Sequence, residues 1–336
     1  MDRSNALPEN WRGPGLLDLQ INGFAGFDFN GPSEQWTAEE LERIRRGLAR
    51  RGIMAALPTL ITDDLQAMLA RARAYRHSIE RDPALAEAFP KLHVEGPFIS
   101  SEDGPRGAHR KAYCRAPRDL PDFLARMREA SGDRIGILTL APELPGAVDL
   151  IAEAAAVRIC VAIGHTAASV ETIQVAIQAG ARMSTHLGNG SHQTLPRLDN
   201  YVQAQLAEDR LAASFIADGH HIPFFTLKNF LRAKTPQRSI LVSDAIAAAD
   251  AGPGRYLLGG EEVMVTSDLR CSKPGQPNLA GSALTLDRAV VNVCAQCGIP
   301  FEQVWDMAST NPASLIRIPP PRTVSVAVGP DGVEMD

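Results

Sequence analysis

The chain has 336 residues, of which 45% are hydrophobic and only 5% aromatic, and its formal net charge is -5. Such a chain can bury a sizeable core built mainly from Ala, Leu, Ile and Val, which favours helices packed on a parallel sheet over a β-sandwich. The mild charge, without a basic stripe, argues against nucleic acid as the main partner. No apolar run approaches the roughly 20 residues that a membrane helix needs.

The N-terminal segment MDRSNALPENWRGPG is polar and lacks the apolar middle of a signal peptide, which predicts a cytosolic protein. Five cysteines, an odd number, do not form a disulfide framework. Cys294 and Cys297 make a CxxC motif that invites a redox or zinc interpretation. They fall inside a helical pattern and no second CxxC completes a zinc site, so we expect core or surface cysteines.

Eight short apolar runs follow one another along the chain, and most are separated by stretches of 10–18 residues with helical spacing. Runs of this kind are typical of strands in βαβ units, whose parallel strands are buried on both faces. The predicted strands are residues 16–22, 53–61, 91–96, 134–142, 158–166, 181–187, 211–219 and 239–245.

Helical patterns are clearest at 37–52, 63–80, 284–298 and 301–318. Eight strands alternating with helices predict a closed (β/α)8 TIM barrel, with a doubly wound open sheet as the second interpretation. No GxGxxG follows a strand and no GxxxxGKS/T motif occurs, so a nucleotide-binding fold would lack its phosphate loop.

Three long insertions, at 97–117, 188–201 and 246–282, each follow the carboxyl end of a predicted strand. Barrel enzymes build their active sites from the loops at this end. We expect residues 1–318 to form the catalytic barrel. Residues 319–336 then form a short C-terminal tail with a proline turn and one edge strand, TVSVAV.

Polar side chains end five of the predicted strands. They lie in 93–97, 164–166, 185–187, 217–221 and 243–245. One such residue alone is more often a cap or packing residue than a ligand, but five at one rim favour a site. A carboxylate and two imidazoles on separate strands, with one position left for water, form the ligand set of a catalytic zinc. The metal would lower the pKa of its water toward about 7, and Asp244 could take the proton and return it to a leaving amine.

At these residues the sequence resembles the N-acetylglucosamine-6-phosphate deacetylase family, a branch of the amidohydrolase superfamily. The matching blocks occur in the family's order and span most of the chain. They are PGLLDLQINGFAGFDFN (14–30), HVEGPFIS (93–100), LTLAPE (138–143), GHTAAS (164–169), THLGNG (185–190), IADGHHIP (216–223), LVSDAIAAAD (241–250), LAGSALTLDRAVVN (279–292) and ASTNPASLI (308–316).

The resemblance implies that Glu95, His165 and His186 bind a divalent metal, for which zinc is the first choice and iron, cobalt and manganese are alternatives. It implies that Asp244 is the general base and then the general acid. His109 resembles the histidine that faces the substrate, where it could hydrogen-bond the developing oxyanion.

Gln20 and Asn22 stand where many amidohydrolases have a His-x-His pair. Carboxamides are poor zinc ligands, and one-metal members of the family share this pattern, so we expect one metal and not two. Gln20 and Asn22 would then either hydrogen-bond the barrel rim or contact the substrate.

The implied substrate is an amino sugar, N-acetylglucosamine 6-phosphate, that is cleaved to acetate and glucosamine 6-phosphate. His221 resembles the histidine that holds the sugar, and Leu279, Ala280 and Gly281 resemble the loop that lines it. Asn189 and Gly190 occupy the positions whose backbone meets the phosphate. Arg197, eleven residues after His186, matches the phosphate-pairing arginine by spacing.

Two features depart from the family's pattern. Family members build a small β-sandwich from an N-terminal segment and a longer C-terminal tail, so we expect that domain to be missing or reduced to a stub. After the sixth strand, SHQTLPRLDNYVQAQ replaces the family's Arg-Glu-Pro-Gly context, and Arg197 keeps the spacing but not the neighbours. His192 and Tyr201, in the same loop, are expected to be solvent-exposed or local caps.

These departures keep two further hypotheses open. One is a related amide hydrolase with the same metal site and another N-acyl substrate, including one without a phosphate. The other is a non-catalytic barrel that binds a sugar. The resemblance also leaves a homodimer open, since family members are commonly dimers.

Overall fold

Eight parallel strands coincide with the eight predicted apolar runs and form one curved sheet in chain order. The computed structural model describes residues 7–276 and 278–335. The strands are β2 (Leu16–Ile21), β5 (Ile53–Ile61), β6 (Leu92–Glu95), β7 (Ile135–Leu140), β8 (Cys160–Ile163), β9 (Met183–Ser184), β10 (Ala212–Ile216) and β11 (Ser239–Val242).

The end strands β2 and β11 are joined by backbone hydrogen bonds at their carboxyl ends. Asp244 N donates to Gln20 O over 2.9 Å, and Asn22 N donates to Ala245 O over 2.7 Å. These bonds bring the sheet to a nearly closed barrel. The predicted eight-stranded parallel barrel is confirmed, and the open-sheet alternative is wrong.

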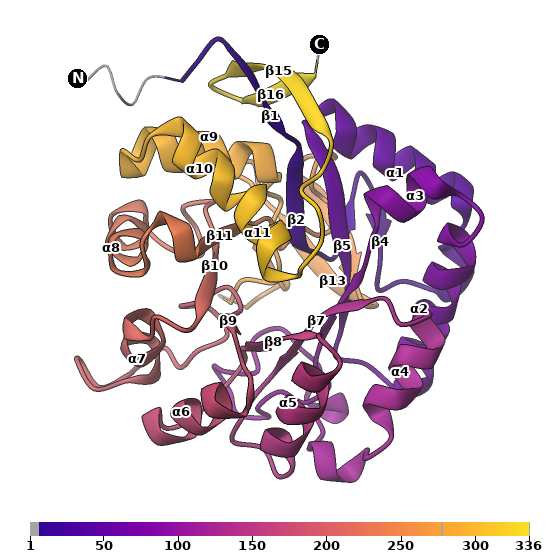
Figure 1. Ribbon diagram of the computed structural model, residues 1–336, viewed down its shortest axis with the longest axis vertical. Coiled ribbons are helices and arrows are strands. Elements are labelled where there is room, and N and C mark those ends of the chain that lie inside the picture. The colour runs from indigo at the N-terminus through magenta and orange to yellow at the C-terminus, as the bar shows by residue number, and fades with distance from the viewer. Residues whose placement is uncertain (1–6, 277, 336) are drawn as a thin grey trace.

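Helices surround the barrel (Figure 1). They are α1 (Ala38–Arg50), α2 (Leu65–Ile79), α3 (Pro83–Ala88), α4 (Phe123–Ser131), α5 (Ala147–Ala156), α6 (Val170–Ala179), α7 (Tyr201–Ala207), α8 (Phe224–Lys234), α9 (Leu286–Cys297), α10 (Phe301–Met307) and α11 (Thr310–Leu315). Short 3-10 turns occur at η2 (Ser33–Gln35), η3 (Lys111–Tyr113), η4 (Pro117–Asp119) and η5 (Pro236–Arg238).

Helix α1 illustrates how the local sequence sets these elements. The Thr37 side chain accepts a hydrogen bond from Glu40 N and so caps the first turn. Leu41, Ile44 and Leu48 recur at helical spacing and are buried against the barrel. The barrel strands need no such alternation, because parallel strands covered by helices are buried on both faces; all six residues of β2 are buried.

The helical pattern at 301–318 is not one helix but two, α10 and α11. Pro312, near the start of α11, has no N–H to donate to the carbonyl of Ala308. That carbonyl instead accepts a 2.8 Å hydrogen bond from Leu17 N in β2. The break therefore ties this helical segment to the first strand of the barrel.

A separate three-stranded antiparallel sheet consists of β1 (Asn10–Pro14), β15 (Thr323–Gly329) and β16 (Gly332–Met335), in the order β1-β15-β16. The prediction of one edge strand at TVSVAV is therefore wrong. This segment is the central strand, because β1 pairs with one side of it and β16 with the other. Val324 and Val326 point inward and are buried, which their alternation along β15 allows. Both ends of the described chain meet here (Figure 1).

The insertion at 246–282 contains a second small antiparallel sheet, with β12 (Gly254–Leu258), β13 (Glu261–Val265) and β14 (Cys271–Ser272). Val263, Val265 and Leu258 belong to a small hydrophobic cluster distinct from the main core. A short hairpin, β3 (Gly23–Phe24) and β4 (Phe27–Asp28), follows β2. The insertion is thus a folded unit that can hold side chains in place, not an irregular loop.

Cys294 and Cys297 lie buried in α9 with free thiols. Burial raises the pKa of these thiols to about 12 and about 11, so both stay protonated near neutral pH, as expected for structural cysteines. Within the described residues, no helix has both the length and the apolar character to cross a membrane. The first six residues lie outside the described part, so the prediction about the N-terminal segment stays a prediction.

Candidate active site

A cavity of about 660 Å³ opens at the carboxyl ends of the barrel strands, and residues of all three insertions line it. Most of the predicted site residues are among its lining: Asn22, Glu95, His109, His165, His186, Asn189, Gly190, His221, Asp244, Leu279 and Gly281. Three predicted residues do not line it. Gln20 and Ala280 are buried, and Arg197 is exposed.

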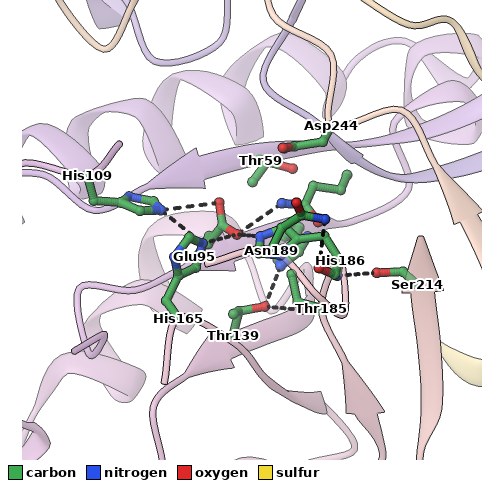
Figure 2. Close-up of polar contacts among 12 residues, drawn as sticks. Thr59, Glu95, His109, Thr139, His165, Thr185, His186, Asn189, Ser214 and Asp244 are labelled. Carbon is green, nitrogen blue, oxygen red and sulfur yellow. Dashed lines mark hydrogen bonds and ion pairs between the residues drawn. The ribbon is translucent and has the colours of Figure 1, made fainter. Parts of the chain in front are cut away.

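Glu95, at the end of β6, is the centre of a tight buried cluster (Figure 2). His165 Nε2 lies 3.2 Å from Glu95 Oε1, and His186 Nε2 lies 3.0 Å from the same oxygen. The two imidazole rings meet edge to face, with centroids 4.8 Å apart. The three residues predicted as metal ligands therefore converge, although they come from strands separated by up to 91 residues in sequence.

His109 reaches the same cluster from the loop after β6. Its Nε2 is 3.2 Å from His165 Nε2 and 3.8 Å from Glu95 Oε2. Glu95, His109 and His165 also form a group whose ligand atoms all lie within 4.8 Å of one another. Glu95, His165 and His186 sit at the ends of barrel strands, which fix side chains more rigidly than a loop does.

The backbone is left-handed at three of these strand ends, with φ of +52° at His165, +32° at His186 and +50° at Asp244. Residues with a Cβ rarely adopt this conformation, and it costs of order 1–3 kcal/mol when imposed. Here it turns each side chain away from the strand direction and into the cavity mouth. Backbone strain at functional residues of this kind is common in active sites.

The charge state of the cluster follows from burial and from its own contacts. Burial opposes ionisation of Glu95, but the hydrogen bonds of His165 and His186, with the charges of His165 and His109, outweigh it and hold the pKa of Glu95 well below its usual value. Burial, helped by the neighbouring His165, lowers the pKa of His109 to about 3. An ionised carboxylate beside a neutral imidazole is the state in which both bind a metal.

Gln20 and Asn22 each donate to one of the two site carboxylates. Gln20 Nε2 donates to Glu95 Oε1 over 3.0 Å, and Asn22 Nδ2 donates to Asp244 Oδ1 over 2.8 Å. They lie two residues apart, so their side chains point to the same face of the chain. Of the two roles left open, hydrogen bonding within the rim is the one this geometry supports for both residues.

Asp244 faces this cluster across the barrel mouth (Figure 2). Burial, and next the negative charge of Glu95, raise the pKa of Asp244 above its usual value, while His186 and His221 oppose the rise. A carboxyl group with a raised pKa is suited to take up a proton and release it again.

A second layer of polar residues supports the cluster from inside the barrel. His93, two residues before Glu95 on β6, has Nδ1 3.0 Å from Leu19 O and Nε2 2.7 Å from Thr139 Oγ1. Thr139 in turn hydrogen-bonds Thr185 over 2.8 Å. Burial lowers the pKa of His93 to about 4, so this histidine is a neutral structural residue and is not part of the cavity lining.

Glycines of two loops pack on the ring of His165. A Cβ on Gly190 would lie 2.7 Å from His165 Nδ1, and one on Gly107 would lie 3.2 Å from its Cε1. Both glycines also have left-handed φ values, +56° and +58°. Only glycine can lie this close to the His165 ring. The backbone of the 188–201 loop therefore runs directly beside this candidate metal ligand.

His221 is held at the cavity by Asp218. Its Nδ1 is 2.7 Å from Asp218 Oδ2, and the backbone N–H of His221 donates to Asp218 Oδ1 over 2.9 Å. This pairing fixes the ring and leaves Nε2 for a ligand. The Asn189 backbone N–H is engaged elsewhere, because it donates to His186 O over 2.9 Å.

The structure does not bring Arg197 to the cavity. The loop is anchored at His192, whose N–H donates to Tyr201 OH over 2.8 Å, and at Asn200, which caps α7. Between these anchors the chain turns outward, and the neighbouring Leu198 is 85% exposed. Spacing along the sequence placed Arg197 at the right distance from His186 but could not show which way the loop bends.

His192 and Tyr201 prove to be linked rather than separately exposed. His192 Nδ1 lies 3.1 Å from Tyr201 OH, and His192 Nε2 lies 3.2 Å from Glu102 Oε2. Tyr201 is buried, and its hydroxyl accepts the backbone N–H of His192. Of the two predicted roles, this is closer to a local cap than to a solvent-exposed residue. The contact with Glu102 joins the 188–201 insertion to the 97–117 insertion at the cavity.

Three cationic side chains in the cavity lining were not predicted. Arg110 comes from the 97–117 insertion, and Arg270 and Lys273 come from the 246–282 insertion. No motif marked them. The signal that could have found them is the position of both insertions after strand ends, where barrel loops supply the residues that meet the substrate.

The donor set fits a divalent metal. One carboxylate and imidazole nitrogens converge at hydrogen-bonding distances in a buried site, and the other ring nitrogen of His165 lies 2.9 Å from Pro105 O, as is usual for a ligating histidine. With Asp244 facing this set at the open end of a (β/α)8 barrel, the site has the composition of a metal-dependent hydrolase.

Comparison with known proteins identifies the family. No family model matches the chain. N-acetylglucosamine-6-phosphate deacetylase of Bos taurus is 33% identical over 318 residues, covering 91% of this chain and 74% of its own length. N-acetylgalactosamine-6-phosphate deacetylase of Escherichia coli O157:H7 is 29% identical, covering 91% and 78%. The structure of a mutant N-acetyl-D-glucosamine-6-phosphate deacetylase of Mycobacterium smegmatis, in complex with N-acetyl-D-glucosamine-6-phosphate, superposes with a TM-score of 0.86 at 25% identity, covering 96% of this chain and 84% of that one.

The chain belongs to the N-acetylglucosamine-6-phosphate deacetylase family. It is therefore a hydrolase of amide C–N bonds, of the amidohydrolase type, and the resemblance seen in the sequence is confirmed.

Proposed function

We propose that this enzyme removes the acetyl group of N-acetylglucosamine 6-phosphate and releases acetate and glucosamine 6-phosphate. The observation that carries the proposal is the convergence of Glu95, His165 and His186 opposite Asp244, in the cavity of a chain from this family.

We propose Glu95, His165 and His186 as the ligands of one divalent metal, with zinc as the first choice for a carboxylate and two imidazoles. Bound there, such a metal supplies a Lewis acid that polarises an acyl oxygen and makes water nucleophilic at neutral pH. Gln20 donates to Glu95 Oε1 and so orients the carboxylate.

Asp244 then acts as the acid–base group. It takes the proton of the attacking water and returns it to the sugar nitrogen, because an amine leaves poorly unless it is protonated. Asn22 holds the carboxylate through its 2.8 Å hydrogen bond. His109, buried and neutral, donates to the oxyanion that develops on the acetyl oxygen.

The remaining predicted residues form the sugar and phosphate contacts in this proposal. His221, held by Asp218, contacts the sugar, and Leu279, Ala280 and Gly281 form the loop beside it. Gly190 offers its backbone N–H to the phosphate, and Asn189, whose own backbone N–H donates to His186 O, lies beside it in the cavity lining. Arg197 has no part in this arrangement within one chain, because it is exposed away from the cavity.

Acetate release by protein purified without chelator tests the proposal, together with metal analysis of the same sample. We expect about one zinc per chain and turnover of N-acetylglucosamine 6-phosphate. Turnover of only the unphosphorylated sugar, or of another N-acyl compound, would leave the amidohydrolase class intact and refute the phosphate assignment. A chain that binds sugar but neither holds metal nor releases acetate would favour the non-catalytic barrel.

N-acetylgalactosamine 6-phosphate belongs in the same assay. One relative is a deacetylase of that sugar, at an identity only slightly lower than that of the bovine relative. A kcat/KM for the galactose epimer above that for the glucose epimer would reassign the substrate without changing the mechanism.

We propose, finally, that the sheet of β1, β15 and β16 takes the place of the family's small β-sandwich, beside a catalytic barrel that begins at β2 and ends near residue 318. Both ends of the described chain contribute strands to this sheet, which supports the assignment. A cytosolic location and a homodimer remain predictions, to be checked by fractionation and by light scattering.

A further inference from the structure

A pair of cations lines the cavity on the side of the 246–282 insertion, linked by one carboxylate. Lys273 Nζ donates to Glu261 Oε2 over 3.3 Å, and Arg110 Nε lies 3.3 Å from Glu261 Oε1. Two positive charges against one negative charge leave this part of the wall positive. All three residues line the cavity, and the Lys273 side chain is only 18% exposed.

Neighbouring contacts hold this pair in place. Arg110 also donates to Gly259 O and stacks over the ring of Tyr113, with 5.5 Å between the guanidinium carbon and the ring centroid. Arg110 is thereby committed to structural partners. The Lys273 ammonium has three N–H groups, and the bond to Glu261 uses one of them.

Lys273 and the proposed reacting groups share one cavity. His109, His165 and Asp244 are part of its lining together with Lys273.

The loop of Gly190 faces the segment that follows Lys273. Gln193 Nε2 donates to Asn278 Oδ1 over 3.2 Å, which joins the 188–201 insertion to the 246–282 insertion, and both residues line the cavity. A substrate group lying near the junction of these loops would meet backbone from one side and an ammonium from the other.

We propose that Lys273 is the cation that binds the anionic substituent of the substrate, a dianionic phosphomonoester, between its own segment and the loop of Gly190. Glu261 and Arg110 position the ammonium. The inference rests on the proposed function, in which the sugar carries a 6-phosphate. It assigns to a lysine of the 246–282 insertion the role that sequence spacing had given to Arg197. A lysine ammonium is a compact charge well suited to phosphate oxygens.

Calorimetric titration of the metal-loaded enzyme with glucosamine 6-phosphate and with glucosamine tests the assignment without turnover. In Lys273→Met the affinity for glucosamine 6-phosphate should fall about 10- to 100-fold, as expected for a lost charged hydrogen bond worth about 1.5–3 kcal/mol. The affinity for glucosamine should fall much less. Lys273→Arg, which keeps the charge, should restore most of the affinity.

Lys111→Met is the matched control, since Lys111 is an exposed lysine of the 97–117 insertion. It should bind glucosamine 6-phosphate as the wild type does. Thermal melting confirms that each variant is folded. Equal weakening of both ligands in Lys273→Met, or unchanged binding there with a loss in Arg197→Met, overturns the inference. So does a wild-type enzyme that prefers glucosamine.

The outcomes separate this inference from the proposed function. Acetate release from N-acetylglucosamine 6-phosphate with normal phosphate selectivity in Lys273→Met would retain the function and refute the role of Lys273. Selective loss of phosphate binding in that variant, in an enzyme that releases no acetate, would retain Lys273 and refute the function.

Discussion

The floor and the wall of the cavity are built in different ways. The floor consists of Glu95, His165, His186 and Asp244, which sit at the ends of parallel strands and are at most 9% exposed. The wall beside Lys273 belongs to the small antiparallel sheet of β12, β13 and β14, which has its own hydrophobic cluster. The floor shares the rigidity of the barrel core, while the wall can change without disturbing it.

We expect this difference to separate chemistry from selectivity. Reacting groups must be held to within a fraction of an ångström, which packed strands achieve. Groups that recognise a substituent tolerate more variation, and loops on a rigid scaffold supply them. Changes in the floor should therefore abolish metal binding or turnover, and changes in the wall should alter substrate affinity.

The largest effect is expected from His165→Ala. Removal of one of three proposed ligands should lower the metal content, measured by inductively coupled plasma mass spectrometry, from about one ion per chain to a small fraction. Acetate release should fall below detection. His77→Ala, at an exposed histidine of α2, should keep both metal and activity. Full activity in His165→Ala would show that the floor is not the reaction centre.

Asp244→Asn should separate the acid–base role from metal binding. Turnover should fall by about 10²- to 10⁴-fold, because a neutral amide neither accepts nor returns the proton. Metal content should stay near the wild-type value. Asp103→Asn, at a cavity-lining acid whose side chain is 85% exposed, is the control and should change kcat little. Loss of metal from Asp244→Asn would instead make Asp244 a ligand.

Asp18, below the floor, predicts a pH-dependent stability. Burial raises the pKa of Asp18 to about 7 from 3.8, so the folded state favours the protonated carboxyl. Its stabilising contribution is complete below about pH 4 and is lost as the pH rises through about 7.

Asp18→Asn stays neutral and keeps an acceptor for Gln20 N and Ser243 N. Its free energy of unfolding should exceed that of the wild type by at most about 4 kcal/mol above pH 8 and match it below about pH 4. Urea unfolding at several pH values measures the difference. A difference that does not vary with pH would contradict the raised pKa.

The smallest effect is expected where the wall is exposed. His192→Ala removes the contact with Glu102, whose side chain is 62% exposed, and the contact with Tyr201. An exposed contact of this kind is worth up to about 1 kcal/mol, so KM should rise by about fivefold at most, with kcat and metal content unchanged. A large fall in kcat would mean that this loop contact positions the reacting groups of the floor, so that floor and wall would not act separately.

The sequence predicted the floor far better than the wall. All eight barrel strands coincide with apolar runs, because burial on both faces demands continuous Val, Leu, Ile and Ala. The convergence of Glu95, His165, His186 and Asp244 was predicted because motifs place them at strand ends. The two short helices in 301–318 were missed: Pro312 removes one helical hydrogen bond, but the partner that takes up the freed carbonyl of Ala308 is Leu17, which is distant in sequence.

The residues of the wall could not be predicted from the sequence, for a physical reason. Arg197 kept the expected spacing from His186, yet its loop turns outward between the anchors at His192 and Asn200. Lys273 carried no motif, and its place in the cavity depends on Glu261 and on the pairing of β13 with β14.

The sequence by itself determined the barrel, the residue types at the rim and the family, because periodic burial and strand-end motifs are local properties of the chain. Only the tertiary structure decided which side chains meet. Contacts such as those of Glu95 with His186, or of Lys273 with Glu261, depend on the closure of the sheet and the direction of each loop, which are set by packing between segments remote in sequence.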